Sequence, residues 1–164
     1  MRHPVKSDAI LFDIFSSPLG KLFIVFSGKF LCGISFQKPH NIPFKRGAAP
    51  ESFIRELSAY FEGSVGQFRQ ETKLLTGTDF EQHVWSGLKD VPFGETRTYK
   101  WIAEKIGRPA AVRAVGRALS KNPIPIVFPC HRIIESDGSV GGYSSGVDRK
   151  RRLLDMEYYA RMNR

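Results

Sequence analysis

The stretch IPIVFPCHRII, residues 124–134, places a cysteine and a histidine side by side at the end of an apolar run. Pro129 stands directly before Cys130, and an arginine follows His131. A cysteine in this setting can be a nucleophile, a metal ligand or a packed core residue. Because only the thiolate attacks, and a free thiol has a pKa of about 8.5, a reactive Cys130 needs a base or a positive charge close by.

His131 is the nearest base, but adjacency in sequence is weak support for a catalytic pair. In an extended strand successive side chains point to opposite faces, so the thiol and the imidazole would meet through a water unless the backbone turns at Pro129–Cys130. A histidine in this role also needs a carboxylate to hold its tautomer. The downstream candidates are Asp148, Asp155 and Glu157. Local chemistry alone leaves a catalytic and a structural Cys–His pair equally open.

The composition is that of a folded globular protein with one sizeable or two small domains. The chain has 164 residues, of which 41% are hydrophobic, and this is enough to bury a core. Its formal net charge is +9. Such an excess favours an anionic partner, either nucleic acid or a membrane surface, and a basic surface that serves only solubility is the alternative.

Cysteine and histidine usage argues against disulfides and metal. Two cysteines, Cys32 and Cys130, cannot build a disulfide framework and indicate free thiols in a reducing compartment. The four histidines are scattered without the spacing typical of a metal site, so we expect no metal. The first residues lack the continuous apolar segment of a signal peptide, and no stretch is long enough to span a membrane. These features predict a cytoplasmic protein.

Residues 1–75 are predicted to form a small sheet domain. Residues 9–36 are rich in Ile, Phe and Val and are cut twice by turn residues, which predicts three short antiparallel strands with Cys32 as a core thiol in the third. A proline-rich loop over residues 37–50 precedes a helix whose apolar face carries Phe53, Leu57 and Phe61. The segment from residue 64 to residue 77 is predicted to be a linker or an edge strand.

Residues 76–164 change in character and predict a helical domain. Thr78 and Glu81 have the spacing of a capping box at the start of a first helix. A second helix is predicted over residues 98–107, with threonine at its start and glycine at its end. A third is predicted over residues 109–122, with a proline in its first turn.

The second and third of these helices form a helix-turn-helix candidate. The third should bury Val112, Val115 and Leu119, while small residues between them would let a groove wall come close. Basic side chains surround the unit: Lys100, Lys105, Arg108, Arg113, Arg117 and Lys121. This concentration favours nucleic acid over a membrane, and the alternative is an ordinary helical hairpin with a solvated basic face.

Three longer strings carry a family resemblance: FEQHVWSGLKDVPFGETRTY, IGRPAAVRAVGRALSKNPIPIVFPCHRII and GSVGGYSSGVDRKRRLLDME. In this order, and nearly without gaps, they strongly resemble the O6-alkylguanine-DNA alkyltransferases, also called methylated-DNA–protein-cysteine methyltransferases. The string PCHR within NPIPIVFPCHRII is similar to the active-site signature of that family. The string SPLGKLFIVFSGKFLCGISF resembles its more weakly defined N-terminal domain.

The resemblance implies a repair reaction on double-stranded DNA. Cys130 would attack the alkyl carbon on guanine O6 and keep the group as a thioether, so each molecule would act once and would need no cofactor. His131 would take the thiol proton through a water, and Glu157 would orient that histidine. Tyr99 would contact the target nucleotide and assist guanine as the leaving group. Asn122 would hold the turn between the recognition helix and the active-site segment.

A base inside a duplex cannot reach a buried thiol, so the resemblance also implies a flipped nucleotide. The helix-turn-helix would lie in the minor groove, with Arg113 filling the gap left by the base and Ala111 allowing close approach. Further DNA contacts would come from Lys100, Arg108 and Ser136. The guanine pocket would be walled by Pro125, Ile133, Gly141, Tyr143 and Ser144.

These features predict an α/β (α+β) fold, in which a small N-terminal antiparallel sheet domain with a helix precedes a mainly helical, winged-helix-like domain that contains the helix-turn-helix. The protein should be a monomer that binds no membrane. Some relatives carry a structural zinc or an upstream regulatory domain with extra cysteines, and the single N-terminal Cys32 supports neither. The basic run Arg149–Arg152 is interpreted as a solvated helix face.

Three alternative functions compete with DNA repair. A non-catalytic binder of alkylated DNA would share the fold, but such relatives replace the acceptor cysteine, whereas Cys130 is present. A Cys–His hydrolase would need an oxyanion hole and leaves the basic helix-turn-helix unexplained. A plain helix-turn-helix regulator leaves PCHR unexplained.

Overall fold

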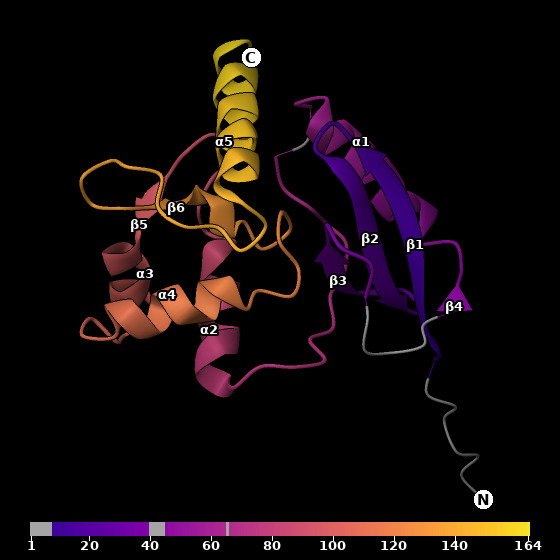
Figure 1. Cartoon of the computed structure of the whole chain (residues 1–164), viewed down its shortest axis with the longest axis horizontal. Coiled ribbons are helices and arrows are strands. Elements are labelled where there is room, and N and C mark those ends of the chain that lie inside the picture. Colours follow the sequence, from indigo (N-terminus) through magenta and orange to yellow (C-terminus); the bar gives the residue numbers. More distant parts are fainter. Residues whose placement is uncertain (1–7, 40–44, 65) are drawn as a thin grey trace, which may run out of the picture.

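The computed structural model describes residues 8–39, 45–64 and 66–164 (Figure 1). Strands β1 (Ile10–Ser17), β2 (Gly20–Ser27) and β3 (Phe30–Ser35) form an antiparallel meander, as the sequence predicts. A two-residue turn joins β1 to β2, and Gly20 after it has a φ of 114°, a conformation that favours glycine. Strand β4 (Lys45–Arg46) pairs with β1 in parallel, so the sheet order is β3-β2-β1-β4.

The N-terminal helix α1 (Glu51–Phe61) shares a core with the sheet. Alternate residues of β2, including Leu22 and Ile24, are fully buried, as period-two patterning requires. Phe53 and Leu57 of α1 are also fully buried, as predicted. Phe61, the third predicted apolar position, is partly buried and packs against the core. The predicted positions did not include Tyr60, which is fully buried three residues after Leu57.

The second half contains four helices and a 3-10 turn. They are α2 (Asp79–Leu88), α3 (Tyr99–Lys105), α4 (Val112–Ser120), the turn η1 (Cys130–Arg132) and α5 (Val147–Met162). Strands β5 (Arg97–Thr98) and β6 (Ile133–Ile134) form a short parallel pair. The capping box at the start of α2 is confirmed, and the Thr98 hydroxyl caps α3 by accepting from the Trp101 amide. A mixed fold with an N-terminal antiparallel sheet and a helical C-terminal part is thus confirmed.

Three local predictions in the second half were wrong. Helix α4 begins at Val112, so Pro109 lies in the preceding turn and not in the first helical turn. Val112 is 37% exposed, because at the start of α4 it faces a cavity and not the core. Lys150, placed by the sequence on a solvated face, is 1% exposed and donates to the carbonyls of Ile133 and Gly142 at 2.6 and 3.0 Å.

The loop predicted over residues 37–50 also differs, because it contains β4; residues 40–44 lie outside the described residues. The segment after α1 is a linker that touches the sheet edge. Thr72 makes an isolated parallel bridge to Leu31, whose amide donates to the Glu71 carbonyl at 3.0 Å. Cys32 is buried, as predicted.

The two halves pack against each other with α5 at their boundary (Figure 1). Arg152 of α5 donates to the Pro18 carbonyl at 2.7 Å, and the Arg149 guanidinium lies 4.3 Å from the Phe36 ring centre. The Ile34 amide of β3 donates to the Pro123 carbonyl at 2.9 Å, just before the Cys–His segment. None of the described helices is long and apolar enough to cross a membrane.

Candidate active site

The segment between α4 and η1 is a tight loop held by Asn122. The side-chain oxygen of Asn122 accepts from the Ile124 amide at 3.0 Å, and its side-chain nitrogen donates to the Phe128 carbonyl at 2.8 Å. Inside this loop Ile126 has a φ of 76°, which is strained for a β-branched residue. The surrounding hydrogen bonds maintain that strain, and they fix the direction in which the chain enters Cys130.

The backbone turns at Pro129–Cys130, where η1 begins. The Cys130 amide donates to the Phe128 carbonyl at 2.7 Å, and the Arg132 amide donates to the Pro129 carbonyl at 3.0 Å. The alternation of an extended strand is therefore broken. Within the described part of the chain, no hydrogen bond joins the Cys130 thiol to the His131 ring.

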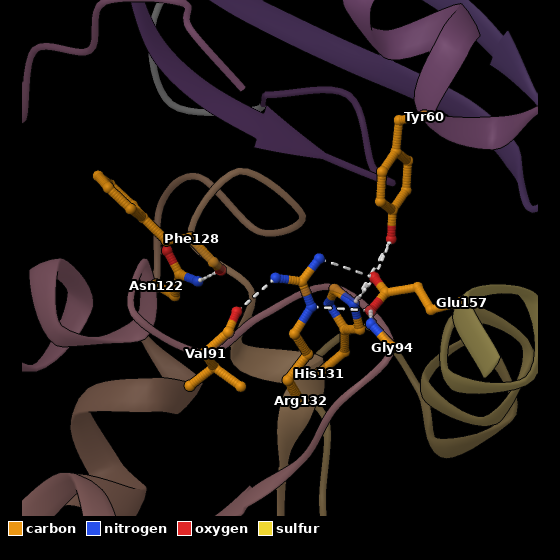
Figure 2. Close-up of polar contacts among 8 residues, drawn as sticks. All are labelled: Tyr60, Val91, Gly94, Asn122, Phe128, His131, Arg132 and Glu157. Carbon is orange, nitrogen blue, oxygen red and sulfur yellow. Dashed lines mark hydrogen bonds and ion pairs between the residues drawn. The ribbon is translucent and has the colours of Figure 1, made fainter. Parts of the chain in front are cut away.

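His131 pairs with Glu157 of α5 (Figure 2). The imidazole Nε2 lies 2.6 Å from Glu157 Oε2, and both side chains are almost completely buried. Of the three carboxylates that the sequence left open, Asp148 and Asp155 are exposed. The tertiary structure therefore selects Glu157 as the partner of His131.

The Glu157 carboxylate accepts hydrogen bonds from Arg132, Gly94 and Tyr60 in addition to His131 (Figure 2). Arg132 reaches both carboxylate oxygens, with Nε at 2.7 Å and Nη2 at 3.1 Å, and the Gly94 amide donates at 3.2 Å. The Tyr60 hydroxyl donates to Oε2 at 2.5 Å. Burial raises the pKa of the Glu157 carboxyl, but the charges and hydrogen bonds of His131 and Arg132 outweigh it, so this pKa lies well below its usual range.

An ionised Glu157 determines the tautomer of His131. Because the carboxylate can only accept, Nε2 carries the hydrogen, and in the neutral ring Nδ1 is then an acceptor. His131 Nδ1 is buried and has no hydrogen-bond partner among the residues that the structure describes. The arrangement can therefore take up one proton at Nδ1, with the charge stabilised by Glu157.

Cys130 lies in the wall of a cavity of about 520 Å³ and is 6% exposed. Burial raises the pKa of its thiol to about 11, and Asn122 and the Lys150 ammonium only partly oppose this effect. The thiol is therefore protonated at neutral pH. A reaction at sulfur needs its proton removed as the new bond forms, which is work for a base such as His131.

The cavity lies between α3, α4 and the loop before α5. Four predicted site residues line it: Tyr99, Cys130, Tyr143 and Ser144. The other residues that line it are Val112, Gly116, Leu119, Ser120, Glu135 and Gly142. Its volume falls within the range of about 300–1,000 Å³ that small-molecule sites occupy.

The remaining predicted pocket residues lie nearby but do not line this cavity. Gly141 has a φ of 75°, and a side chain there would meet the Tyr99 hydroxyl at 3.1 Å. Pro125 is buried in the Asn122 loop, and Ile133 lies in β6. Glu135 is a carboxylate at the cavity that sequence reasoning missed.

The residues predicted to contact DNA lie on the surface beside this cavity. Lys100, Arg108, Arg113 and Ser136 are exposed, and Ala111 is half-buried at the start of α4. Lys100 lies 3.9 Å from Glu104, whereas no carboxylate within the described ranges forms an ion pair with Arg108 or Arg113. The structure thus places exposed cations on the helix-turn-helix next to the cavity opening.

Sequence reasoning missed three of the residues that hold the site together. Tyr60 comes from the other half of the chain, and nothing local to Glu157 indicates it. Arg132 was noted only as the neighbour of His131, yet it makes two hydrogen bonds to Glu157. Lys150 belongs to the basic run Arg149–Arg152, which was interpreted as a solvated helix face. Only its position three residues before the buried Leu153 could have indicated that its side chain is buried.

The fold and the site define a class of protein in which a buried cysteine, backed by a His–Glu pair, faces a cavity beside a basic helix-turn-helix. Among the described residues no group of three His, Cys, Asp or Glu side chains could hold a metal ion. Two family models match the chain. Residues 79–159 match the DNA-binding domain of 6-O-methylguanine DNA methyltransferase, and residues 10–74 match the ribonuclease-like domain of the same family.

Individual relatives agree with these matches. A methylated-DNA–protein-cysteine methyltransferase of Methanosarcina barkeri is 44% identical, over 89% of this chain and 96% of the relative. Its counterpart in Mycobacterium leprae is 42% identical, over 86% and 88%. A crystal structure of Mycobacterium tuberculosis O6-methylguanine methyltransferase has a TM-score of 0.85 at 38% identity and covers 92% of this chain and 94% of that one. The chain belongs to the 6-O-methylguanine DNA methyltransferase family.

Proposed function

We propose that this protein repairs double-stranded DNA by transferring the alkyl group of an O6-alkylguanine irreversibly to its own Cys130. The observation that carries this proposal is the placement of Cys130, which lies in a cavity wall next to the buried His131–Glu157 pair. The relatives named as methylated-DNA–protein-cysteine methyltransferases support the same activity. A single protein molecule then acts as a single-turnover transferase, because the thioether is not hydrolysed.

The reaction is one displacement at the alkyl carbon. The Cys130 sulfur forms the new carbon–sulfur bond as the bond to guanine O6 breaks, and the electron pair of that bond returns to the base. His131 takes the thiol proton through a water, and the guanine takes up a proton with the help of Tyr99. Glu157 holds the imidazole and stabilises its charge. Asn122 supports the site by keeping the loop before Cys130 in place. No cofactor takes part.

We further propose that the helix-turn-helix binds the minor groove and that the target nucleotide is flipped into the cavity. A crystal structure of the Mycobacterium tuberculosis relative in complex with DNA has a TM-score of 0.86 to this chain at 39% identity. Exposed Arg113 on α4 occupies the gap left by the base, and Ala111 lets the helix come close. Further contacts to the DNA come from Lys100, Arg108 and Ser136.

The base is held in the cavity by Tyr99, Tyr143 and Ser144, and Pro125, Ile133 and Gly141 support the walls. We also propose that the chain divides into domains at about residue 75, between the two family matches. The protein acts as a monomer in the cytoplasm.

The rival functions explain less. A non-catalytic binder of alkylated DNA has no use for a thiol next to a buried His–Glu pair, and the relatives named as methyltransferases do not favour it. A hydrolase would regenerate its cysteine, and a plain regulator would need neither the thiol nor the cavity.

The test is a mass measurement after incubation with duplex DNA that contains O6-methylguanine. We expect the intact protein to gain one methylene and the peptide that carries Cys130 to hold it. Cys130→Ala should abolish the gain while retaining DNA binding, whereas Cys32→Ala is the matched control and should react like the natural chain. Unmodified protein that binds the DNA would instead support the non-catalytic binder.

A further inference from the structure

Tyr60 connects the N-terminal half of the chain to the His131–Glu157 pair. It is fully buried at the end of α1, and its hydroxyl donates to Glu157 Oε2 at 2.5 Å. The same carboxylate oxygen accepts from His131 Nε2, and the Tyr60 hydroxyl also lies 3.5 Å from that nitrogen. In Figure 2 the Tyr60 hydroxyl points at the Glu157 carboxylate from above, and the Gly94 amide lies below that carboxylate.

The ring of Tyr60 is held in place independently of its hydroxyl. It packs edge-on against Phe61 and Phe93, with ring centres 5.2 and 6.0 Å away, and it is tilted against Phe68 at 5.4 Å. Burial, and then the negative charge of Glu157, raise the pKa of the Tyr60 phenol well above its ordinary value. The hydroxyl therefore stays protonated and remains a fixed donor.

We propose that Tyr60 is a positioning residue of the alkyl-transfer site, through which the N-terminal half of the chain holds Glu157 and sets how strongly it attracts a proton onto His131. This inference rests on the function proposed above. Each added hydrogen bond to a carboxylate stabilises its negative charge and makes it a weaker partner for a neighbouring cation. Without the hydroxyl, Glu157 is freer to rotate and binds an imidazolium more strongly.

The other groups around the pair do not replace this donor. Arg132 from η1 and the Gly94 amide occupy the remaining acceptor positions of Glu157. Tyr143, from the loop before α5, forms no hydrogen bond to Glu157, since its buried hydroxyl has no hydrogen-bond partner among the described residues. Removing the Tyr60 hydroxyl therefore takes away the shortest hydrogen bond to Oε2 and leaves that oxygen with His131 Nε2 and Arg132 Nη2 as its donors.

The decisive variant is Tyr60→Phe, which keeps the packed ring and removes only the hydroxyl. We expect its rate of alkyl transfer from free O6-benzylguanine at neutral pH to fall about tenfold, as for other small misplacements of catalytic groups. We also expect the acid side of its pH–rate profile to move to higher pH, because a protonated His131 cannot accept the thiol proton. Affinity for duplex DNA should not change. Tyr159→Phe, which alters an exposed tyrosine on α5, is the matched control.

A double-mutant cycle separates positioning from general stability. If Tyr60 acts through Glu157, Tyr60→Phe should lose its effect on rate in a Glu157→Gln background. An unchanged rate and pH profile in Tyr60→Phe would overturn the inference, as would a loss that persists in that background or that matches the fraction unfolded in a melting curve. If the natural chain itself transfers no alkyl group, the proposed function fails, which is a different result from a natural chain and a Tyr60→Phe variant that react equally fast.

Discussion

At the scale of single residues, Cys130 combines two properties that conflict in water. Its sulfur must be a nucleophile, yet burial raises the pKa of the thiol to about 11. A permanently ionised thiolate would react with many electrophiles, whereas a protonated one reacts only where a base takes its proton in the same step. His131, which we propose as that base, follows Cys130 in the sequence, and the turn at η1 brings its ring to Glu157. In the proposed reaction, selectivity for the bound alkyl group follows from this arrangement.

The raised pKa of Cys130 predicts a loss of stability at alkaline pH. The unfolded thiol ionises near 9.0 and the folded thiol near 11, so the folded state binds the proton more tightly. The protonated thiol therefore contributes about 3 kcal/mol to the free energy of unfolding. This contribution is complete below pH 9.0 and is lost as the pH rises through 11. Urea denaturation at about pH 8 and about pH 10.5 should show a larger loss for the natural chain than for Cys130→Ser. If the natural chain and Cys130→Ser lose the same stability, the thiol ionises as easily in the folded protein as in the unfolded chain.

At the scale of elements, α3 and α4 connect the cavity to the basic surface. Tyr99 at the start of α3 and Gly116 of α4 both line the cavity, and the Tyr99 ring lies close enough to Gly116 that an added side chain would touch it. Trp85 of α2 donates to the Ala118 carbonyl at 2.8 Å and fixes α4 from behind. A helix held in this way can present Arg113 to DNA without moving the cavity wall.

The position of Arg113 on α4 predicts a substrate-dependent defect. Arg113→Ala should slow transfer from O6-methylguanine in duplex DNA by about tenfold or more, because the flipped state loses the side chain that fills the stack. Transfer from the free base should change little, since Arg113 does not line the cavity. Single-turnover rates with the two substrates measure the difference. Equal losses on both would rule out a role in nucleotide flipping, and Arg117→Ala on the same helix is a matched control.

At the scale of the whole molecule, one hydrophobic cluster runs through both halves of the chain. It includes Leu22 of the sheet, Leu57 of α1, Trp85 of α2 and Val115 of α4. Polar contacts across the boundary, such as Ile34 to Pro123 and Tyr60 to Glu157, end on the segments that hold Cys130 and His131. The N-terminal half is therefore packed against the back of the site, on the side away from the helix-turn-helix.

The net charge of +9 predicts strongly salt-dependent DNA binding. If about five of the exposed cations near α3 and α4 contact phosphates, the logarithm of the binding constant should fall with the logarithm of salt concentration with a slope of about −4.5. Fluorescence anisotropy with undamaged duplex DNA over a salt series measures this slope. Lys100→Ala should reduce it by about one. A slope near zero would exclude an electrostatic DNA-binding surface.

Much of the architecture follows from local patterns. The antiparallel meander of β1 to β3, the capping box of α2 and the Thr98 cap of α3 depend on residues close together in sequence, and the structure confirms each of them. The errors arose where distant residues compete. Tyr60 is fully buried because its hydroxyl donates to Glu157, and Lys150 is buried because two loop carbonyls accept from it.

The sequence by itself determined the first three strands, the helices α1 to α3, the mixed fold and the family, because capping, periodicity and a Cys–His motif in its context are all local properties of the chain. Local chemistry left three carboxylates open as partners of His131 and the family resemblance pointed to Glu157, but only the tertiary structure shows that Glu157 is buried while the other two are exposed. It also decided that the thiol is protonated and that a tyrosine 97 positions away from Glu157 completes the hydrogen bonds of its carboxylate. Burial and hydrogen bonding between distant segments set these properties, and neither exists until the chain has folded.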